Sequence, residues 1–390
     1  MAVRKPRVLF LDVVRGLAVL FVLFQHLTED VAPPFLSWGY RWMNYGRLGV
    51  ALFFIVSGFV IPYSLERANS LKVFWVSRVF RLYPIYWFSI LVVLAFHFIG
   101  HHVWDQLGVN MAVLRMEKDV IDSGHYVRTY LINITMAQEF LKTPHVMGLY
   151  WTLSLEMVWY VLFTILFILG INKRSVLWCW TGIGALIAIS LGFKFVKHRY
   201  APAMGSLTML VYATYGTVLF RYYAGLVSGR DVWAVTVGLI VATAIGFGFS
   251  FPLPRQIPAN VVEQWSCISM ITSHIGAILI FAIIFSMRAR EFAFPLRWIG
   301  TVSYSIYLLH FPVWTTLEVI PHQTLLSGIC WELLVTACAI GVSSITYMLV
   351  EQPAIDLGKR LLHRPKPATE LGQPVTEVTP AGPVSVIPSR

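Results

Sequence analysis

Apolar runs of 18 or more residues recur along this chain, and each is long enough to cross a hydrocarbon core of about 30 Å as a helix. Of the 390 residues, 57% are hydrophobic and only 13% are charged, whereas soluble domains average about 25% charged residues. The sequence lacks the strand-period alternation that is typical of a membrane β-barrel. The pattern therefore predicts an all-α membrane protein, a polytopic bundle of about ten transmembrane helices.

Hydropathy and charge place the expected spans. They fall near residues 8–27, 47–65, 82–100, 149–170, 175–193, 203–222, 232–252, 267–287, 297–319 and 325–350. Residues 101–148 form a long polar segment between the third and fourth spans. Its stretch "YLINITMAQEF", residues 130–140, is too short to cross a bilayer, so we expect a re-entrant or interfacial segment there.

The net charge of +11 follows from membrane topology rather than from nucleic-acid binding. Lys and Arg residues gather in short stretches between the apolar runs, and with ten spans most of these stretches fall on one side. That side is expected to be cytoplasmic, with both termini inside. A cluster at Lys194, Lys197 and Arg199 falls on the opposite side and does not fit. The four Cys residues have no CxxC spacing and read as buried small hydrophobes, so no metal site is expected.

The chain is expected to have three regions. Residues 1–7 form a basic N-terminus on the cytoplasmic side, and residues 8–360 form the transmembrane domain. The apolar stretch after Arg4, Lys5 and Arg7 is interrupted by charges and lacks a small-residue cleavage site, which favours a retained first span over a signal peptide. Residues 361–390 are polar and Pro-rich, which predicts a disordered cytoplasmic tail.

The first span carries three polar residues: Asp12, Arg15 and His26. A charged group at bilayer depth costs at least about 2.5 kcal/mol, so such residues usually serve a function. Eleven positions separate Arg15 from His26, about three helical turns, which places both on nearly the same face. Asp12 precedes Arg15 by three positions and can pair with it. The alternative is a structural ion pair together with an interfacial histidine.

Two further segments bring charge to the spans. In "FWVSRVFRLYPIYW", Arg78 and Arg81 lie one turn apart, and paired guanidiniums suit phosphate groups. They could equally be ordinary cytoplasmic flanking residues that contact lipid headgroups. In "GLYWTLSLEMVWYVLF", Glu156 lies about two turns into its span. It could orient a catalytic histidine, as in a triad, or form a packing ion pair.

Polar residues also mark the second and ninth spans. "LFFIVSGFVIP" contributes Ser57 and Gly58, and the glycine permits close approach of a helix or ligand. "IGTVSYSIYLLHFPVW" contributes Tyr304, Tyr307 and His310, with two serines beside them. These hydroxyl and imidazole groups could line an acceptor pocket, or they could be hydrogen-bond partners between helices.

Five segments, in this order, resemble the acyltransferase-3 family of integral membrane O-acyltransferases. They are "LDVVRGLAVLFVLFQH", "GVALFFIVSGFVI", "SRVFRLYPIYW", "WTLSLEMVWY" and "GTVSYSIYLLHFPV", and "EQPAIDLGKR" resembles the closing Glu-x-Pro segment. The resemblance covers roughly residues 7–360. Two departures are Ala51, where Asp is frequent, and Gln352, where Arg is frequent.

The resemblance implies transfer of an acyl group, commonly acetyl, from cytoplasmic acyl-CoA to a hydroxyl of a carbohydrate such as a cell-surface polysaccharide or lipopolysaccharide. It implies an enzyme transferring groups other than amino-acyl groups, in a bacterial inner membrane, with acyl-CoA as co-substrate and no bound cofactor. The essential Arg and His of the family correspond to Arg15 and His26, its Arg pair to Arg78 and Arg81, and its acidic residue to Glu156.

On this reading CoA phosphates bind at Arg78 and Arg81, and the pantetheine arm passes Arg15 and Ser57. His26 acts as general base, supported by Glu156. The acceptor could instead be a small molecule such as a macrolide. A transporter or flippase would also place polar groups inside a helical bundle, but we find no pair of broken spans in corresponding halves of the sequence.

Overall fold

The structure is a computed structural model that describes residues 8–68, 70–107, 126–196, 204–258, 261, 264–322 and 324–362. Within these ranges the chain is helical and contains no strand. The helices are α1 (Leu9–Val31), α2 (Pro33–Arg41), α3 (Tyr45–Ala68), α4 (Leu71–Leu107), α6 (Tyr126–Ile134), α7 (Trp151–Ile168), α8 (Ser175–Leu191), α9 (Met204–Tyr223), α10 (Gly229–Ser250), α11 (Cys267–Ser286), α12 (Phe294–Thr301), α13 (Ser303–Leu317), α14 (Leu325–Thr346) and α15 (Gln352–Leu362). The all-α prediction is confirmed.

Eight helical segments in the described ranges are long and apolar enough to cross a membrane, which agrees approximately with the predicted ten. The two remaining predicted spans, near 203–222 and 297–319, correspond to α9 and to the pair α12 and α13. Residues 1–7 and 363–390, which hold the predicted basic N-terminus and most of the predicted tail, lie outside the described residues.

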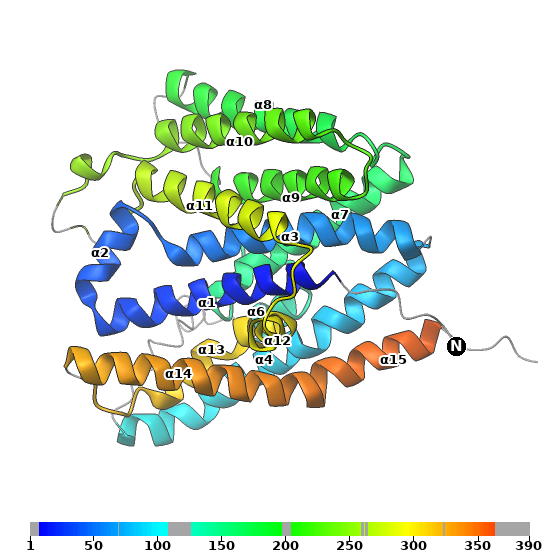
Figure 1. Ribbon diagram of the computed structural model, residues 1–390. Coiled ribbons are helices and arrows are strands. Elements are labelled where there is room, and N and C mark those ends of the chain that lie inside the picture. The colour runs from blue at the N-terminus through cyan, green and yellow to red at the C-terminus, as the bar shows by residue number, and fades with distance from the viewer. Residues whose placement is uncertain are drawn as a thin grey trace, which may run out of the picture.

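The helices pack in layers around α1 and α3 (Figure 1). In that view α8 and α10 lie at the top, α9 and α11 follow, and α14 and α15 lie at the bottom. Helix α3 packs against α1 on one side and α9 on the other. Side chains of α1 and α3 such as Val14, Val19 and Ile55 are fully buried. Among the eight span-length segments of the described residues, α1 and α3 are the most enclosed.

The crossing of α3 and α9 depends on two glycines. A Cβ atom at Gly58 would lie 1.9 Å from the carbonyl oxygen of Ala213, and one at Gly216 would lie 2.1 Å from that of Ile55. No side chain fits at such distances, so the backbones meet directly, as small residues allow between membrane helices. The Thr217 hydroxyl donates to the Gly58 carbonyl oxygen across this contact, at 3.0 Å. Of the two partners predicted for Gly58, the structure supplies a helix.

Helix α4 is longer than the predicted third span. It begins at Leu71, so Arg78 and Arg81 lie within the helix, one turn apart, as their spacing predicted. Helix α6 overlaps the first part of the predicted re-entrant or interfacial stretch and has only nine residues. Its C-terminal end is held against α4, because the Tyr86 hydroxyl donates to the Asn133 carbonyl oxygen at 2.7 Å and Trp87 Nε1 donates to that of Ile134 at 3.0 Å. Residues 108–125 lie outside the described residues.

Candidate active site

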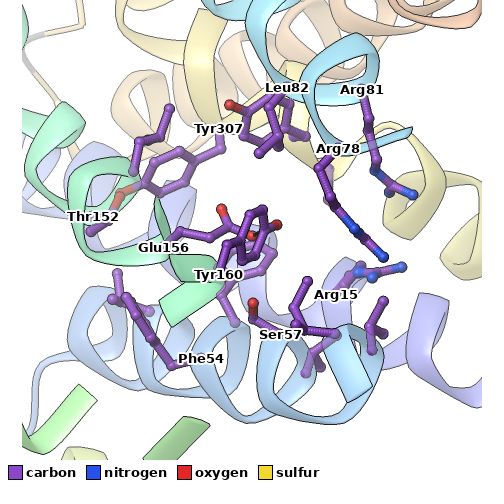
Figure 2. A pocket seen from close by; sticks show the side chains of 18 residues that line it. Arg15, Phe54, Ser57, Arg78, Arg81, Leu82, Thr152, Glu156, Tyr160 and Tyr307 are labelled. Atoms are coloured by element: carbon purple, nitrogen blue, oxygen red, sulfur yellow. Dashed lines mark hydrogen bonds between the residues drawn. The ribbon is translucent and has the colours of Figure 1, made fainter. Parts of the chain in front are cut away.

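A cavity lined by three arginines lies among α1, α3, α4, α7 and α13. It contains about 810 Å³ of empty space, part of it open to the outside. Its lining includes most of the residues predicted from the sequence, namely Arg15, Ser57, Arg78, Arg81, Glu156, Tyr304 and Tyr307. Figure 2 shows the guanidinium groups of Arg15, Arg78 and Arg81 gathered at one end of this cavity, with Thr152 and Tyr307 toward the other. We call this space the arginine cavity.

Two of the arginines, Arg15 and Arg78, are held in place by neighbours on their own and adjacent helices. Arg15 Nη1 donates to Asp12 Oδ1 at 3.3 Å, and the Asp12 side chain is only 3% exposed. This is the pair that the i, i+3 spacing predicted. The guanidinium carbon of Arg78 lies 5.5 Å from the ring centre of Phe74 and 5.8 Å from that of Tyr160, which are cation–π distances. Arg15 and Arg78 are therefore held where they line the cavity.

Glu156 belongs to the arginine cavity. It accepts a very short hydrogen bond from the hydroxyl of Tyr160, one turn further along α7. Glu156 does not line the cavity that holds His26, so the structure does not place it as the group that orients that imidazole. The rotation of α7 about its own axis decides which cavity the carboxylate enters, and apolar periodicity was too weak there to predict it.

A second cavity of about 830 Å³ of empty space surrounds His26. We call it the histidine cavity. The carboxylate Oε2 of Glu29, one turn beyond His26 on α1, lies 4.0 Å from His26 Nδ1. Gln25 Nε2 donates to the other oxygen of Glu29 at 2.6 Å, which fixes the carboxylate. Sequence reasoning missed Glu29, although its i, i+3 spacing from His26 was a usable signal.

His310 faces His26 from α13. The two imidazole rings are stacked, with ring centres 5.8 Å apart and planes inclined by 22°. His310 is 1% exposed, and its Nδ1 donates to the carbonyl oxygen of Tyr307 at 2.8 Å. The residues predicted to form one acceptor pocket are thus divided. Tyr304 lines the arginine cavity, His310 lines the histidine cavity, and Tyr307 lines both.

Val50 and Tyr307 form a shared wall between the two cavities, because both residues line each of them. The Tyr307 hydroxyl is hydrogen-bonded to Thr152 Oγ1 at 2.9 Å, which fixes the ring. A molecule in the arginine cavity and a molecule in the histidine cavity would therefore both contact this wall. Two adjacent cavities of different chemistry suit a reaction between two substrates.

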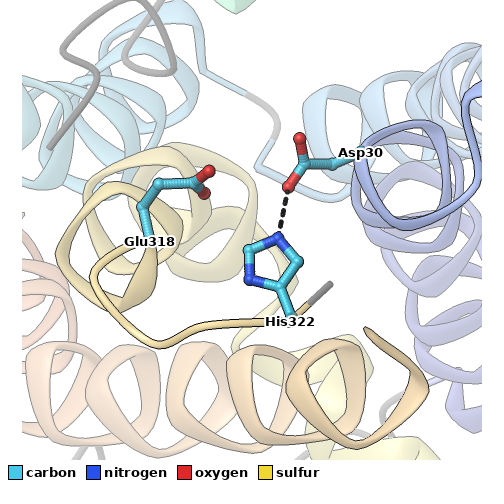
Figure 3. Close-up of side chains that lie close together, drawn as sticks. All are labelled: Asp30, Glu318 and His322. Carbon is cyan, nitrogen blue, oxygen red and sulfur yellow. Dashed lines mark ion pairs between the residues drawn. The ribbon is translucent and has the colours of Figure 1, made fainter. Parts of the chain in front are cut away.

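A cluster of three possible metal ligands lies near the end of α1. Asp30, Glu318 and His322 bring one ligand atom each within 4.8 Å of one another (Figure 3). His322 Nε2 lies 3.3 Å from Asp30 Oδ2, which is an ion pair when the imidazole is protonated. Burial raises the pKa of Glu318, and the charge of Asp30 raises it further. The direct ion pair accounts for this cluster, whose members are too far apart in sequence to be predicted together.

The fold and the two cavities define a membrane-embedded enzyme site, and comparison with known proteins gives its class. The chain belongs to the acyltransferase-3 family, because the family model, described as an acyltransferase domain, matches residues 8–348. The predicted resemblance is confirmed.

Curated relatives carry the same class of name. The chain is 25% identical to the peptidoglycan O-acetyltransferase OatA of Listeria monocytogenes, over 88% of this chain and 55% of the relative. It is 25% identical to the O-acetyltransferase OatA of Staphylococcus aureus (strain MRSA252), over 94% of this chain and 60% of the relative. The chain is 25% identical to a Komagataeibacter xylinus protein named "Putative membrane-bound transacylase BcsY", over 90% of this chain and 83% of the relative. The chain thus spans little more than half the length of the OatA proteins. No solved structure matches it.

Proposed function

We propose that this protein transfers an acyl group, with acetyl as the first candidate, from acyl-CoA to a hydroxyl group of a carbohydrate acceptor at the cell surface. One observation carries the proposal. A cavity lined by three arginines and a cavity lined by a histidine–carboxylate pair share the wall formed by Val50 and Tyr307. Membership of the acyltransferase-3 family and the O-acetyltransferase names of two relatives support it.

The arginine cavity suits the donor. CoA carries several phosphate charges, and guanidinium groups bind phosphate through charge-assisted, often bidentate hydrogen bonds. Arg15, Arg78 and Arg81 would hold these phosphates, and the pantetheine arm would extend past Ser57 toward Tyr307. The Lys/Arg distribution supports an orientation with both termini and the donor end on the cytoplasmic side. The membrane would be the inner membrane of a bacterium.

The histidine cavity suits the acceptor. His26 removes the proton from the acceptor hydroxyl as general base, and the hydroxyl oxygen attacks the thioester carbonyl carbon. The carbon–sulfur bond breaks, and the CoA thiolate leaves and takes a proton from the imidazolium. The Glu29 carboxylate, 4.0 Å from Nδ1, stabilises the charged imidazolium. Glu29 thereby takes the supporting role that the sequence had suggested for Glu156.

The test separates donor binding from chemistry in purified protein in lipid nanodiscs. His26→Ala is expected to abolish acyl transfer and to leave acyl-CoA binding intact. Arg78→Ala and Arg81→Ala are expected to weaken acyl-CoA binding, each by about 10-fold or more, because a hydrogen bond to a charged group is worth about 1.5–3 kcal/mol. Arg230→Ala, on the exposed start of α10, is the matched control. Normal turnover by His26→Ala, or movement of a carbohydrate across the bilayer without acyl-CoA, would overturn the proposal.

A further inference from the structure

Arg47 is a cation of the histidine cavity without an acidic partner among the described residues. It lies in the first turn of α3 and lines the cavity. Two other enclosed arginines do have such a partner, since Arg15 pairs with Asp12 and Arg221 pairs with Glu66, with one nitrogen–oxygen distance of 2.9 Å. None of the ion pairs formed within the described ranges includes Arg47. Its charge remains available to an anion that enters the cavity.

Aromatic rings hold Arg47 in position. Its guanidinium carbon lies 5.4 Å from the ring centre of Trp151 and 5.1 Å from that of Trp265. Cation–π contacts of this kind compensate part of the cost of a desolvated cation, but they leave its hydrogen-bond donors directed elsewhere. Tyr40 packs on Trp265, with ring centres 4.1 Å apart. Three aromatic residues, Tyr40, Trp151 and Trp265, therefore line the cavity beside the cation.

The aromatic rings and the cation together indicate which kind of ligand the histidine cavity suits. Trp and Tyr rings present large apolar faces with a polar edge, and a pyranose ring presents an apolar face of C–H groups that fits them. Arg47 adds a fixed positive charge whose planar fork matches a carboxylate or phosphate group. A neutral sugar would leave this cation without a counter-charge in a partly desolvated space, which is unfavourable.

We propose that the histidine cavity binds a sugar that carries an anionic group, a carboxylate or a phosphate, and that Arg47 pairs with that group. The inference rests on the proposed function in that it takes this cavity as the acceptor site. The Glu29 carboxylate lines the same cavity and repels an anion, so the anionic group lies at the Arg47 end and a hydroxyl group lies at the His26 end. The acceptor is bound in one orientation, which selects the hydroxyl that is acylated.

The test measures thermal unfolding of the purified protein in nanodiscs without acyl-CoA. Glucuronate, glucose 6-phosphate and glucose are added separately at equal concentrations, because a ligand that binds the folded state raises the Tm. We expect a Tm increase with glucuronate, with glucose 6-phosphate or with both, and none with glucose. The anion that raises the Tm identifies the anionic group as a carboxylate or a phosphate. An increase with both shows that the cavity accepts either group.

Substitutions of Arg47 test whether the Tm increase comes from binding at this residue. Arg47→Gln is expected to remove the anion-dependent increase, and Arg47→Lys to weaken the affinity calculated from it by at least about tenfold, because the bidentate contact is lost. Arg255→Gln, an exposed arginine in the loop before Trp265, is the control and should respond like the wild type. If Arg47→Gln does not fold, the anion-dependent Tm increase is measured in Arg47→Lys and Trp265→Phe instead.

Three outcomes would overturn the inference. The first is an equal Tm increase with glucose. The second is no increase with either anion. The third is an increase that survives in Arg47→Gln and disappears in Arg78→Ala, which would place the anion in the arginine cavity. Because no acyl transfer is measured, these outcomes are independent of the His26→Ala experiment on the proposed function.

Discussion

The imidazole rings of His26 on α1 and His310 on α13 lie stacked, with centres 5.8 Å apart. Since His310 Nδ1 donates to the Tyr307 carbonyl oxygen, the orientation of the His310 ring is fixed by its own helix. The fixed His310 ring limits the orientations of the His26 ring that is stacked on it. We infer that His310 positions His26.

Replacing His310 should therefore impair turnover more than binding. We expect His310→Ala to lower kcat by about 10²-fold, the typical effect of a misplaced catalytic group, and to leave the Kd for acyl-CoA unchanged. The pH profile of kcat should also shift, because the neighbour of the proposed general base has changed, and a merely structural variant would not move it. Unchanged kcat and pH profile would contradict the positioning role.

Glu156 should affect the donor, because it lines the arginine cavity. Glu156→Gln removes one negative charge from a space proposed to hold phosphates. We expect acyl-CoA to bind more tightly, by between about twofold and about tenfold, as one screened charge at several ångströms allows. Isothermal titration with acyl-CoA measures this change. A shifted pH profile of kcat with unchanged acyl-CoA affinity would contradict this prediction and would indicate that Glu156 supports His26.

Gly58→Ala should destabilise the bundle. The new methyl group would lie 1.9 Å from the Ala213 carbonyl oxygen, so α3 and α9 must separate. Overpacking of this kind costs about 1–3 kcal/mol, or more where backbone must move. Thermal unfolding in nanodiscs measures the loss. Gly184→Ala on α8 is the matched control, because its Cβ would meet nothing within 4 Å. Equal stability of both variants would contradict the close crossing.

The stability of the wild type should depend on pH through Glu318. Burial and the neighbouring charge of Asp30 raise the pKa of Glu318 in the folded protein. A raised pKa contributes stability that is fully present below the unfolded pKa of about 4.3 and is lost as pH rises through the folded pKa. Glu318→Gln cannot ionise, so its stability relative to wild type should increase from pH 4 to pH 7. Chemical unfolding at both pH values measures this, and a pH-independent difference would contradict it.

The sequence was sufficient for what depends on local helix geometry. The Asp12–Arg15 pair and the common face of Arg78 and Arg81 follow from spacings of three residues along one helix. Arg15 and His26 do share a face of α1, but about 16 Å of helix separates them, and that length places them in different cavities.

What depends on packing between helices was not predictable. Glu156 and Arg47 are assigned to their cavities by the rotation of α7 and α3 about their axes. Trp265 reaches Arg47 from a loop more than two hundred residues away in sequence. No periodicity within one helix contains this information, because neighbouring helices determine which face each helix turns toward which space.

The wall of Val50 and Tyr307 has a consequence for how such a protein can diversify. Among the described residues, only these two belong to both linings. Nearly every residue of the proposed acceptor cavity can therefore be exchanged without altering a contact with the proposed donor. On the proposed assignment, substitutions around Tyr40, Trp151 and Trp265 would change the molecule that receives the acyl group and would leave donor binding unchanged. Selection, or a protein engineer, can thus redirect the enzyme by changing one half of the site at a time.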